Sequence, residues 1–447
     1  MARFGIHSRR TVTQRGIKDA TIVVSDGVIV EVIDGTPDPF GDELVDVGDS
    51  VLMPGIIDPH VHINEPGRTE WEGFDTATRA ALAGGITTLV DMPLNSSPVT
   101  TSVNAFHEKI RAAQTHLHTN CGFWGGVVPG NENDIEPLIA AGVLGFKAFL
   151  IDSGIDEFPS VSEHDLRKAI PLIAKHHLPL LVHCELTADP HSRRGGIYSR
   201  PDSYQAYMNS RPRQWENDAI ALMIRLCEEF NCRTHIVHVS SSDALKQIAK
   251  AKQQGLPITA ETAQHYLFFS AEEIADGQTQ FKCAPPIREG SNNEKLWEGL
   301  KNGILDFVAT DHSPSLPEMK ELQSGDFRKA WGGITSIQFA LPALWTAAKK
   351  HHCEITDIAK WLCERPAPFI GAKKKGRIEK GYNADLVVWS PEDHFIVNGS
   401  MIYHRHHITP YLHKELFGVV KQTYLHGELV FDNGNFLHLN KGKLMIN

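Results

Sequence analysis

Two histidines one residue apart follow the first strongly apolar run of the chain. His60 and His62 lie in the segment DPHVHINEPG (residues 58–67), after the run VLMPGII and before a Pro-Gly turn. Because side chains alternate along an extended strand, both imidazoles point to the same side, as ligands of one transition-metal ion do. The chain has 24 histidines and further pairs of this spacing at His116/His118 and His404/His406, so this pair alone does not establish a metal site.

Four more residues that can bind metal or carry protons lie in or directly after apolar runs. Lys147 lies within GFKAFL, His183 follows LPLLV, His238 follows THIV, and Asp311 follows ILDFVAT. In a (β/α)8 barrel the carboxyl ends of the strands meet at one mouth, where active sites are built. Four imidazoles and one carboxylate suit zinc, manganese, cobalt or ferrous iron, and they exceed what one tetrahedral site with an open position needs. The set therefore predicts two metal ions.

Each of these residues also has a purely structural interpretation. His183 or His238 could be a core histidine that is hydrogen-bonded to the backbone. Asp311 could cap a helix or form an Asx turn. Ligand-type side chains at five strand ends are hard to explain by independent structural causes, so together they favour a metal centre.

Lys147 is the unusual member of the set, because a protonated lysine repels a dication. Its neighbours in GFKAFL are apolar, and burial lowers the pKa of a lysine toward the neutral amine. A neutral amine can add carbon dioxide, and the resulting carbamate could bridge two cations. The alternative is a lysine whose stem is buried and whose amine reaches solvent or an acidic partner.

The elements that must position these residues fall into three parts. Residues 1–53 contain short β-branched strands separated by Asp-Gly, Gly-Asp and Pro-Gly turns. Residues 54–375 alternate short apolar runs with stretches of helical period such as WENDAIALMIRLCEEF, which is typical of βα units and a parallel sheet. Residues 376–447 return to strands and turns. We therefore expect an α/β middle part bracketed by two β-rich ends.

The net charge and the cysteine content indicate which kinds of binding partner and which cellular compartment to expect. The 447 residues carry a net charge of −10, which argues against nucleic acid or an anionic membrane and favours a small-molecule ligand. Seven scattered cysteines predict a reducing compartment, by default the cytoplasm. The first 18 residues are basic and free of acids, so organellar import remains open. His404, His406 and His407 lie in a polar stretch and are expected at the surface.

Several motifs together resemble one known family. The run PGIIDPHVHINEPGRTEWEGF, with GFKAFL, LVHCE, HIVHVSS, KCAPPIR, ATDHSP and KAWGGI, is similar to the cyclic amidohydrolases of the amidohydrolase superfamily, and among them to the allantoinases. The ends match as well, because GRIEKGYNADLVVW resembles C-terminal strands of that family. The resemblance implies a (β/α)8 TIM-type barrel with a small β-sandwich domain formed by the N- and C-terminal segments.

The resemblance also implies roles for the residues above. His60, His62 and Asp311 would bind the more buried metal, His183 and His238 the second, and a carboxylated Lys147 would bridge the two. The ions are expected to be zinc, with cobalt, manganese or iron as alternatives. A metal-bound hydroxide would open the hydantoin ring amide of allantoin to allantoate, in purine catabolism, with Asp311 as general base and then general acid.

Substrate selection is the finer question. Relatives that act on dihydroorotate carry an arginine at the position of Asn64, and Asn64 cannot pair with a substrate carboxylate in that way. Arg68 lies nearby in the sequence, so an anionic substrate stays open as the alternative. Trp71 and the Trp331–Gly333 segment also resemble allantoinases. The residues expected to contact substrate are Asn95, Cys283 and Ser313, although Asn95 could be only a turn residue and Cys283 only a packing residue.

Two other functions stay in view. One is a hydantoinase- or dihydropyrimidinase-type enzyme of broader specificity, and the other is a non-catalytic assembly protein built on the same barrel. No nucleic acid or membrane partner is expected. Analogy with barrels of this family suggests a homotetramer.

Overall fold

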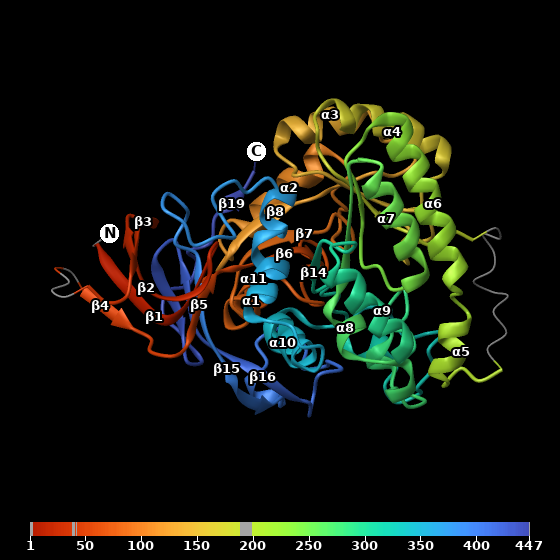
Figure 1. Cartoon of the computed structure of the whole chain (residues 1–447). Helices are drawn as coiled ribbons and strands as arrows, with labels where there is room; N and C mark the ends of the chain where they lie inside the picture. The colour runs from red at the N-terminus through yellow and green to blue at the C-terminus, as the bar shows by residue number, and fades with distance from the viewer. Residues whose placement is uncertain (1–2, 38–40, 42, 188–198, 447) are drawn as a thin grey trace.

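The molecule is an α/β structure in which a (β/α)8 barrel lies beside a small β-sandwich. The computed structural model describes residues 3–37, 41, 43–187 and 199–446. In Figure 1 the red N-terminal strands and the blue C-terminal strands lie side by side at one flank of the barrel, although they come from opposite ends of the chain. The predicted fold class is confirmed.

The barrel wall consists of parallel strands. β8 and β9 are separated by Trp124 alone, and together they occupy one place in the wall. Nearly every strand residue is buried, as expected for parallel strands that are covered on both faces. The strands are β6 (Ile56–Val61), β7 (Ile86–Asp91), β8 (Asn120–Phe123), β9 (Gly125–Gly126), β10 (Phe146–Phe149), β11 (Leu180–His183), β12 (Thr234–Ile236), β13 (Ile258–Ala263) and β14 (Phe307–Ala309).

The barrel closes where its first strand meets the segment after its last strand. Val61 of β6 forms a parallel bridge with His312, and His62 N–H donates to the His312 carbonyl at 2.8 Å. Asp58 of β6 accepts hydrogen bonds from the backbone N–H of Thr310, at 3.2 Å, and from its hydroxyl. This contact brings the His60 region next to Asp311.

Helices cover the outside of the barrel, as Figure 1 shows for α3, α4, α6 and α7. In α6 (Arg213–Phe230) the buried apolar residues recur at helical spacing, including Ala219, Ile220, Met223 and Cys227, so one stripe faces the barrel. The other α-helices are α1 (Phe74–Ala83), α2 (Val103–Ala113), α3 (Glu132–Ala141), α4 (Glu163–Lys175), α5 (Tyr204–Asn209), α7 (Leu245–Gln253), α8 (Gln264–Phe268), α9 (Gly290–Lys301), α10 (Ala340–Lys350), α11 (Ile355–Ala359) and α12 (Pro366–Phe369).

The β-sandwich is built on one continuous sheet from the two ends of the chain. Its order is β18-β17-β16-β15-β5-β1-β2-β3, with β4 paired to β1. β5 and β15 join the two halves, for example through Met53 opposite Val387. The strands are β1 (Phe4–Thr13), β2 (Gly16–Ser25), β3 (Val28–Asp34), β4 (Glu43–Asp46), β5 (Val51–Pro54), β15 (Leu386–Ile396), β16 (Glu415–Leu425), β17 (Glu428–Asp432) and β18 (Asn435–Phe436).

The described residues near both ends of the chain belong to strands. In the basic N-terminal stretch, residues 4–13 form β1 and residues 16–18 begin β2, with Ile6 fully buried. The C-terminal tail leaves the sandwich, and its short strand β19 (Leu444–Met445) pairs in parallel with β8 of the barrel. All seven cysteines are free and buried. In the part of the chain that the structure describes, no helix is long and apolar enough to cross a membrane.

One buried ion pair braces the strand ends beside the paired histidines. Lys109 of α2 contacts Asp91 at the end of β7 at 2.6 Å, and both side chains are only 1% exposed. Asp91 also accepts from the backbone N–H of Ile63 at 2.8 Å, and Lys109 donates to the Met92 carbonyl at 3.0 Å. The ion pair therefore ties α2 and β7 to the residue that follows His62.

Replacing Lys109 with methionine is expected to destabilise the fold, because Asp91 then stays buried without its cation. Breaking a buried pair from one side costs about 3–5 kcal/mol, and urea unfolding measures that loss. The matched control is Lys168→Met, since Lys168 pairs with Glu132 at 3.5 Å with both side chains partly exposed, and such a pair contributes less than about 1 kcal/mol. Equal unfolding midpoints in the two variants would contradict this account.

Candidate metal centre

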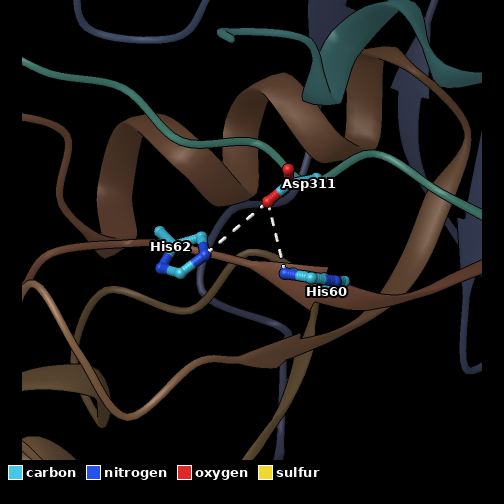
Figure 2. A group of neighbouring side chains, drawn as sticks. All are labelled: His60, His62 and Asp311. Atoms are coloured by element: carbon cyan, nitrogen blue, oxygen red, sulfur yellow. Dashed lines mark ion pairs between the residues drawn. The ribbon is translucent and has the colours of Figure 1, made fainter. Parts of the chain in front are cut away.

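The two histidines of the His-x-His pair face the carboxylate of Asp311. His60 Nε2 lies 3.2 Å and His62 Nε2 lies 3.7 Å from Asp311 Oδ1. Figure 2 shows the carboxylate, on the segment after β14, pointing toward both imidazoles on and just after β6. One ligand atom from each of the three residues lies within 4.8 Å of the others. This spacing suits the coordination of a single metal ion.

A second pair of imidazoles stands next to the first group. His183 ends β11, and its Nδ1 lies 2.9 Å from Nε2 of His238, which follows β12. The ring of His238 lies 5.5 Å, centroid to centroid, from that of His60. Two imidazole nitrogens that point at the same place offer a second position for a cation, beside the His60, His62 and Asp311 group.

Lys147 of β10 lies buried at the same mouth. Its side chain is fully buried, and Nζ has no hydrogen-bond partner among the described residues. The ammonium lies 4.8 Å from the ring of Phe149, which stacks on His183. Burial lowers the pKa of Lys147 to about 8. A buried amine without a partner and with a lowered pKa is the state that carbamate formation requires, as predicted from the apolar GFKAFL context.

Burial also sets the charge of the histidines. It lowers the pKa of His183 to about 4 and the pKa values of His62 and His238 well below the usual range. These imidazoles are therefore neutral near pH 7, which is the form that binds metal. Burial raises the pKa of the Asp311 carboxyl above its usual range. The donor set and the unpartnered Lys147 amine together fit a pair of bound cations.

Two of these residues have a backbone conformation that is rare for side-chain-bearing residues. His238 has φ of 38° and Asp311 has φ of 47°, both in the left-handed region. Such conformations cost free energy and cluster at functional sites. Here the left-handed turn directly after β12 and β14 aims each side chain into the barrel mouth.

All nine residues predicted for the site line one cavity of about 370 Å³. They are His60, His62, Asn95, Lys147, His183, His238, Cys283, Asp311 and Ser313. The Ser313 hydroxyl lies 3.2 Å from Asp311 Oδ1, to which it can donate. The Asn95 side-chain amide lies 3.4 Å from His62 Nδ1. Asn95 and Ser313 thus contact predicted metal ligands.

Of the other residues considered for substrate selection, some line the cavity and some do not. Trp331 and the two glycines after it line the cavity. Trp71 packs edge-on against Trp331, with ring centroids 5.0 Å apart, and is not itself in the cavity wall. Asn64 is buried outside that wall, where its amide donates to the Pro314 carbonyl at 3.2 Å. Asn64 therefore contacts the segment that follows Asp311.

Two buried carboxylates at this site were not identified from the sequence. Glu261 of β13 contacts Nδ1 of His60 and lies 3.2 Å from Nε2 of His235. Glu185 lies 2.8 Å from Nε2 of His183 and forms two contacts with Arg211. The only available signal was an acidic residue in an otherwise apolar strand or strand end, in TAETA and in LVHCE.

The expectation that His404 is a surface residue was wrong. His404 is 1% exposed and packs against the rings of His312 and Phe339. The connection between β15 and β16 folds back onto the barrel, where the N–H of Arg405 donates to Glu72 at 3.1 Å. His407 is exposed and His406 is partly exposed. Of the three histidines, only His404 is thus buried, by contacts with residues distant in sequence.

The chain is similar to known proteins over nearly its whole length. The amidohydrolase family model matches residues 51–430. An allantoinase of Streptomyces avermitilis is 45% identical over 441 residues, which cover 98% of both chains. The allantoinase of Arabidopsis thaliana is 43% identical and covers 96% of this chain and 88% of its own.

Solved structures show the same fold. The L-hydantoinase (dihydropyrimidinase) of Arthrobacter aurescens covers 100% of both chains with a TM-score of 0.94 at 29% identity. The fold is thus shared over the full length of the chain. The chain belongs to the amidohydrolase family and, within it, to the allantoinases.

Proposed function

We propose that this protein hydrolyses the hydantoin ring amide of allantoin to give allantoate, a reaction of purine nitrogen catabolism. The observation that carries the proposal is the convergence of four histidines, Lys147 and Asp311 on one cavity of about 370 Å³. The high identity to named allantoinases over nearly the whole chain supports the choice of substrate. A cavity of this size accommodates a small heterocycle.

Two divalent ions, zinc by preference, would be held by these side chains. His60, His62 and Asp311 would hold one ion, and His183 and His238 the other, with the carbamate of Lys147 between them. Bound cations of this kind lower the pKa of water toward neutrality and polarise a carbonyl oxygen. The lowered pKa values of His62, His183 and His238 and the buried, unpartnered Lys147 amine support this assignment.

Asp311 is the proton carrier in this proposal. Its carboxylate faces His60 of β6 and His62, which follows β6, and takes a proton from the attacking water. The water oxygen bonds to the ring carbonyl carbon, the carbon–nitrogen bond breaks, and Asp311 returns the proton to the leaving nitrogen. Ser313 can hold the carboxylate through its hydroxyl, 3.2 Å away.

The remaining cavity wall would hold the substrate. Asn95, Cys283 and Ser313 lie where backbone and side-chain groups can contact the ring amides. Trp331, braced by Trp71, would form an apolar face for the flat ring. Since Asn64 is neutral and engaged with the Pro314 carbonyl, it offers no cation for a substrate carboxylate, which favours a neutral ring over dihydroorotate.

Two further expectations belong to this proposal. The seven free, buried cysteines fit a reducing compartment, and we assign the protein to the cytoplasm. A homotetramer is expected by analogy with other barrels of the family.

The substrate is tested by comparing ring opening of allantoin, dihydroorotate and unsubstituted hydantoin by one preparation loaded with metal and bicarbonate. We expect kcat/KM to be highest for allantoin and dihydroorotate to be the poorest substrate. Equal rates on allantoin and hydantoin would favour the broader hydantoinase-type activity, which the structural similarity to the Arthrobacter enzyme makes the second candidate. Lack of hydrolysis with full metal loading would leave a non-catalytic barrel.

The Asp311→Asn variant is expected to lose at least about 10²–10⁴-fold in kcat, because an amide cannot accept the proton. Steady-state kinetics on allantoin measure this loss. Asp393→Asn serves as the control, since Asp393 lies on the sandwich and pairs with Lys421 at 2.7 Å. A kcat for Asp311→Asn within a few-fold of wild type would contradict the assigned role.

Reactivation of metal-free protein by zinc is expected to require bicarbonate and Lys147. Because the pKa of Lys147 is lowered to about 8, its neutral form grows as pH rises through that value. At fixed dissolved carbon dioxide, reactivation should therefore become faster from about pH 7 to about pH 9. The Lys147→Met variant should show no bicarbonate-dependent gain, and an equal gain in that variant would exclude the carbamate.

A further inference from the structure

A buried carboxylate links a histidine of the metal centre to the cavity wall. Glu185 lies two residues after His183, and its side chain is 1% exposed. Its Oε2 lies 2.8 Å from Nε2 of His183. On its other side, Arg211 donates from Nε to Oε1 at 2.9 Å and from Nη2 to Oε2. Arg211 itself lines the cavity.

We propose that Glu185, held by Arg211, is a positioning residue that selects the metal-binding tautomer of His183. This inference rests on the proposed function, because it assumes that His183 and His238 hold the second ion. It goes beyond that proposal by assigning roles to two residues that bind neither metal nor the reacting atoms.

The geometry of His183 shows why a tautomer must be selected. A neutral imidazole carries one proton, on Nδ1 or on Nε2. His183 Nδ1 is only 2.9 Å from His238 Nε2, so a proton on Nδ1 would form a hydrogen bond between the two rings. That proton would occupy the place where a cation must bind. A carboxylate beside Nε2 accepts a hydrogen bond from the Nε2–H, so the proton stays on Nε2 and the Nδ1 lone pair is directed into the cavity.

Arg211 gives the buried Glu185 carboxylate a cationic partner. Burial alone disfavours the anion, whereas a guanidinium with two parallel contacts stabilises it and fixes its orientation. Arg211 lies between α5 and α6, and its carbonyl accepts from Arg288 at 3.3 Å. Arg211 belongs to the same segment as Tyr207 and Ser210, which also line the cavity.

A different buried carboxylate contacts a histidine of each proposed metal position. His60 is contacted by Glu261, which is shared with His235 deeper in the barrel. His183 is contacted by Glu185, which is shared with Arg211 at the cavity wall. Substituting Glu185 should therefore weaken one metal position and spare the other.

The Glu185→Gln variant tests the inference directly. A glutamine amide can donate to Nε2 of His183, which moves the ring proton to Nδ1 and places it between the two rings. We expect wild type to hold two zinc ions per chain and the variant to bind the second ion about 10–100-fold more weakly. Equilibrium dialysis against graded zinc, with metal and protein measured on the same sample, gives both affinities without relying on activity.

Two further variants distinguish a role of Glu185 in positioning His183 from a general loss of protein stability. Arg211→Met keeps the carboxylate but removes its support, and should weaken the same ion by a smaller factor. Arg213→Met is the matched control, because Arg213 pairs with Glu289 and with Asn292 at 2.6 Å and contacts no histidine of the centre. Its two zinc affinities should equal those of wild type.

The outcomes distinguish this inference from the function on which it rests. Wild type with a single zinc ion would overturn the two-ion centre and the inference with it. Two ions in wild type and unchanged second-ion affinity in both Glu185→Gln and Arg211→Met would overturn the inference alone. Equal weakening of both ions in Glu185→Gln would also overturn it, because a general loss of structure would then explain the result.

Discussion

The site depends on one contact, the closure of the barrel between its first strand and the segment after its last. Asp58 on β6 and Thr310 after β14 are joined by hydrogen bonds although about 250 residues separate them. The adjoining bridge between Val61 and His312 fixes the register. His60, His62 and Asp311 meet only because this seam holds. The metal position is in this sense a product of the barrel's topology, and no local segment could form it.

Burial at the mouth of the barrel imposes a second constraint. Histidines taken out of water become neutral, and a lysine there loses much of its tendency to hold a proton, as the lowered pKa of Lys147 shows. The same burial makes each isolated carboxylate costly, so every one needs a partner. Glu261 and Glu185 meet this need by contacting the histidines themselves. The same carboxylate–histidine contacts thus stabilise the buried charges and hold the histidines in place for binding cations.

Much of this architecture could be predicted from the sequence. The alternation of apolar runs with helical stretches indicated βα units and a parallel sheet, and the ligand-type residues at strand ends were consistent with one shared mouth. The resemblance of the motifs to a known family then implied the barrel and the sandwich. Roles in metal and substrate binding, and the domain limits at residues 53/54 and 375/376, stay predictions.

What could not be predicted depends on the register between strands and on turns. The contact of His60 with Glu261 joins residues 201 positions apart, and no local pattern encodes it. Asn64 was interpreted only as a neutral residue in place of an arginine, and its left-handed backbone and its hydrogen bond to the Pro314 carbonyl could not be predicted from that comparison. His404 lies in a polar part of the sequence, and its burial follows only from the way the connection between β15 and β16 folds onto the barrel.

The pairing of β5 with β15 has a consequence for how the chain is made. β1 to β5 leave the ribosome first, whereas the strand that completes their sheet begins only at Leu386. Until then β5 presents an open edge of unpaired backbone groups on that side, of the kind that recruits other strands. The whole barrel must emerge before that edge is covered, so the nascent sandwich carries a long interval of exposure to aggregation.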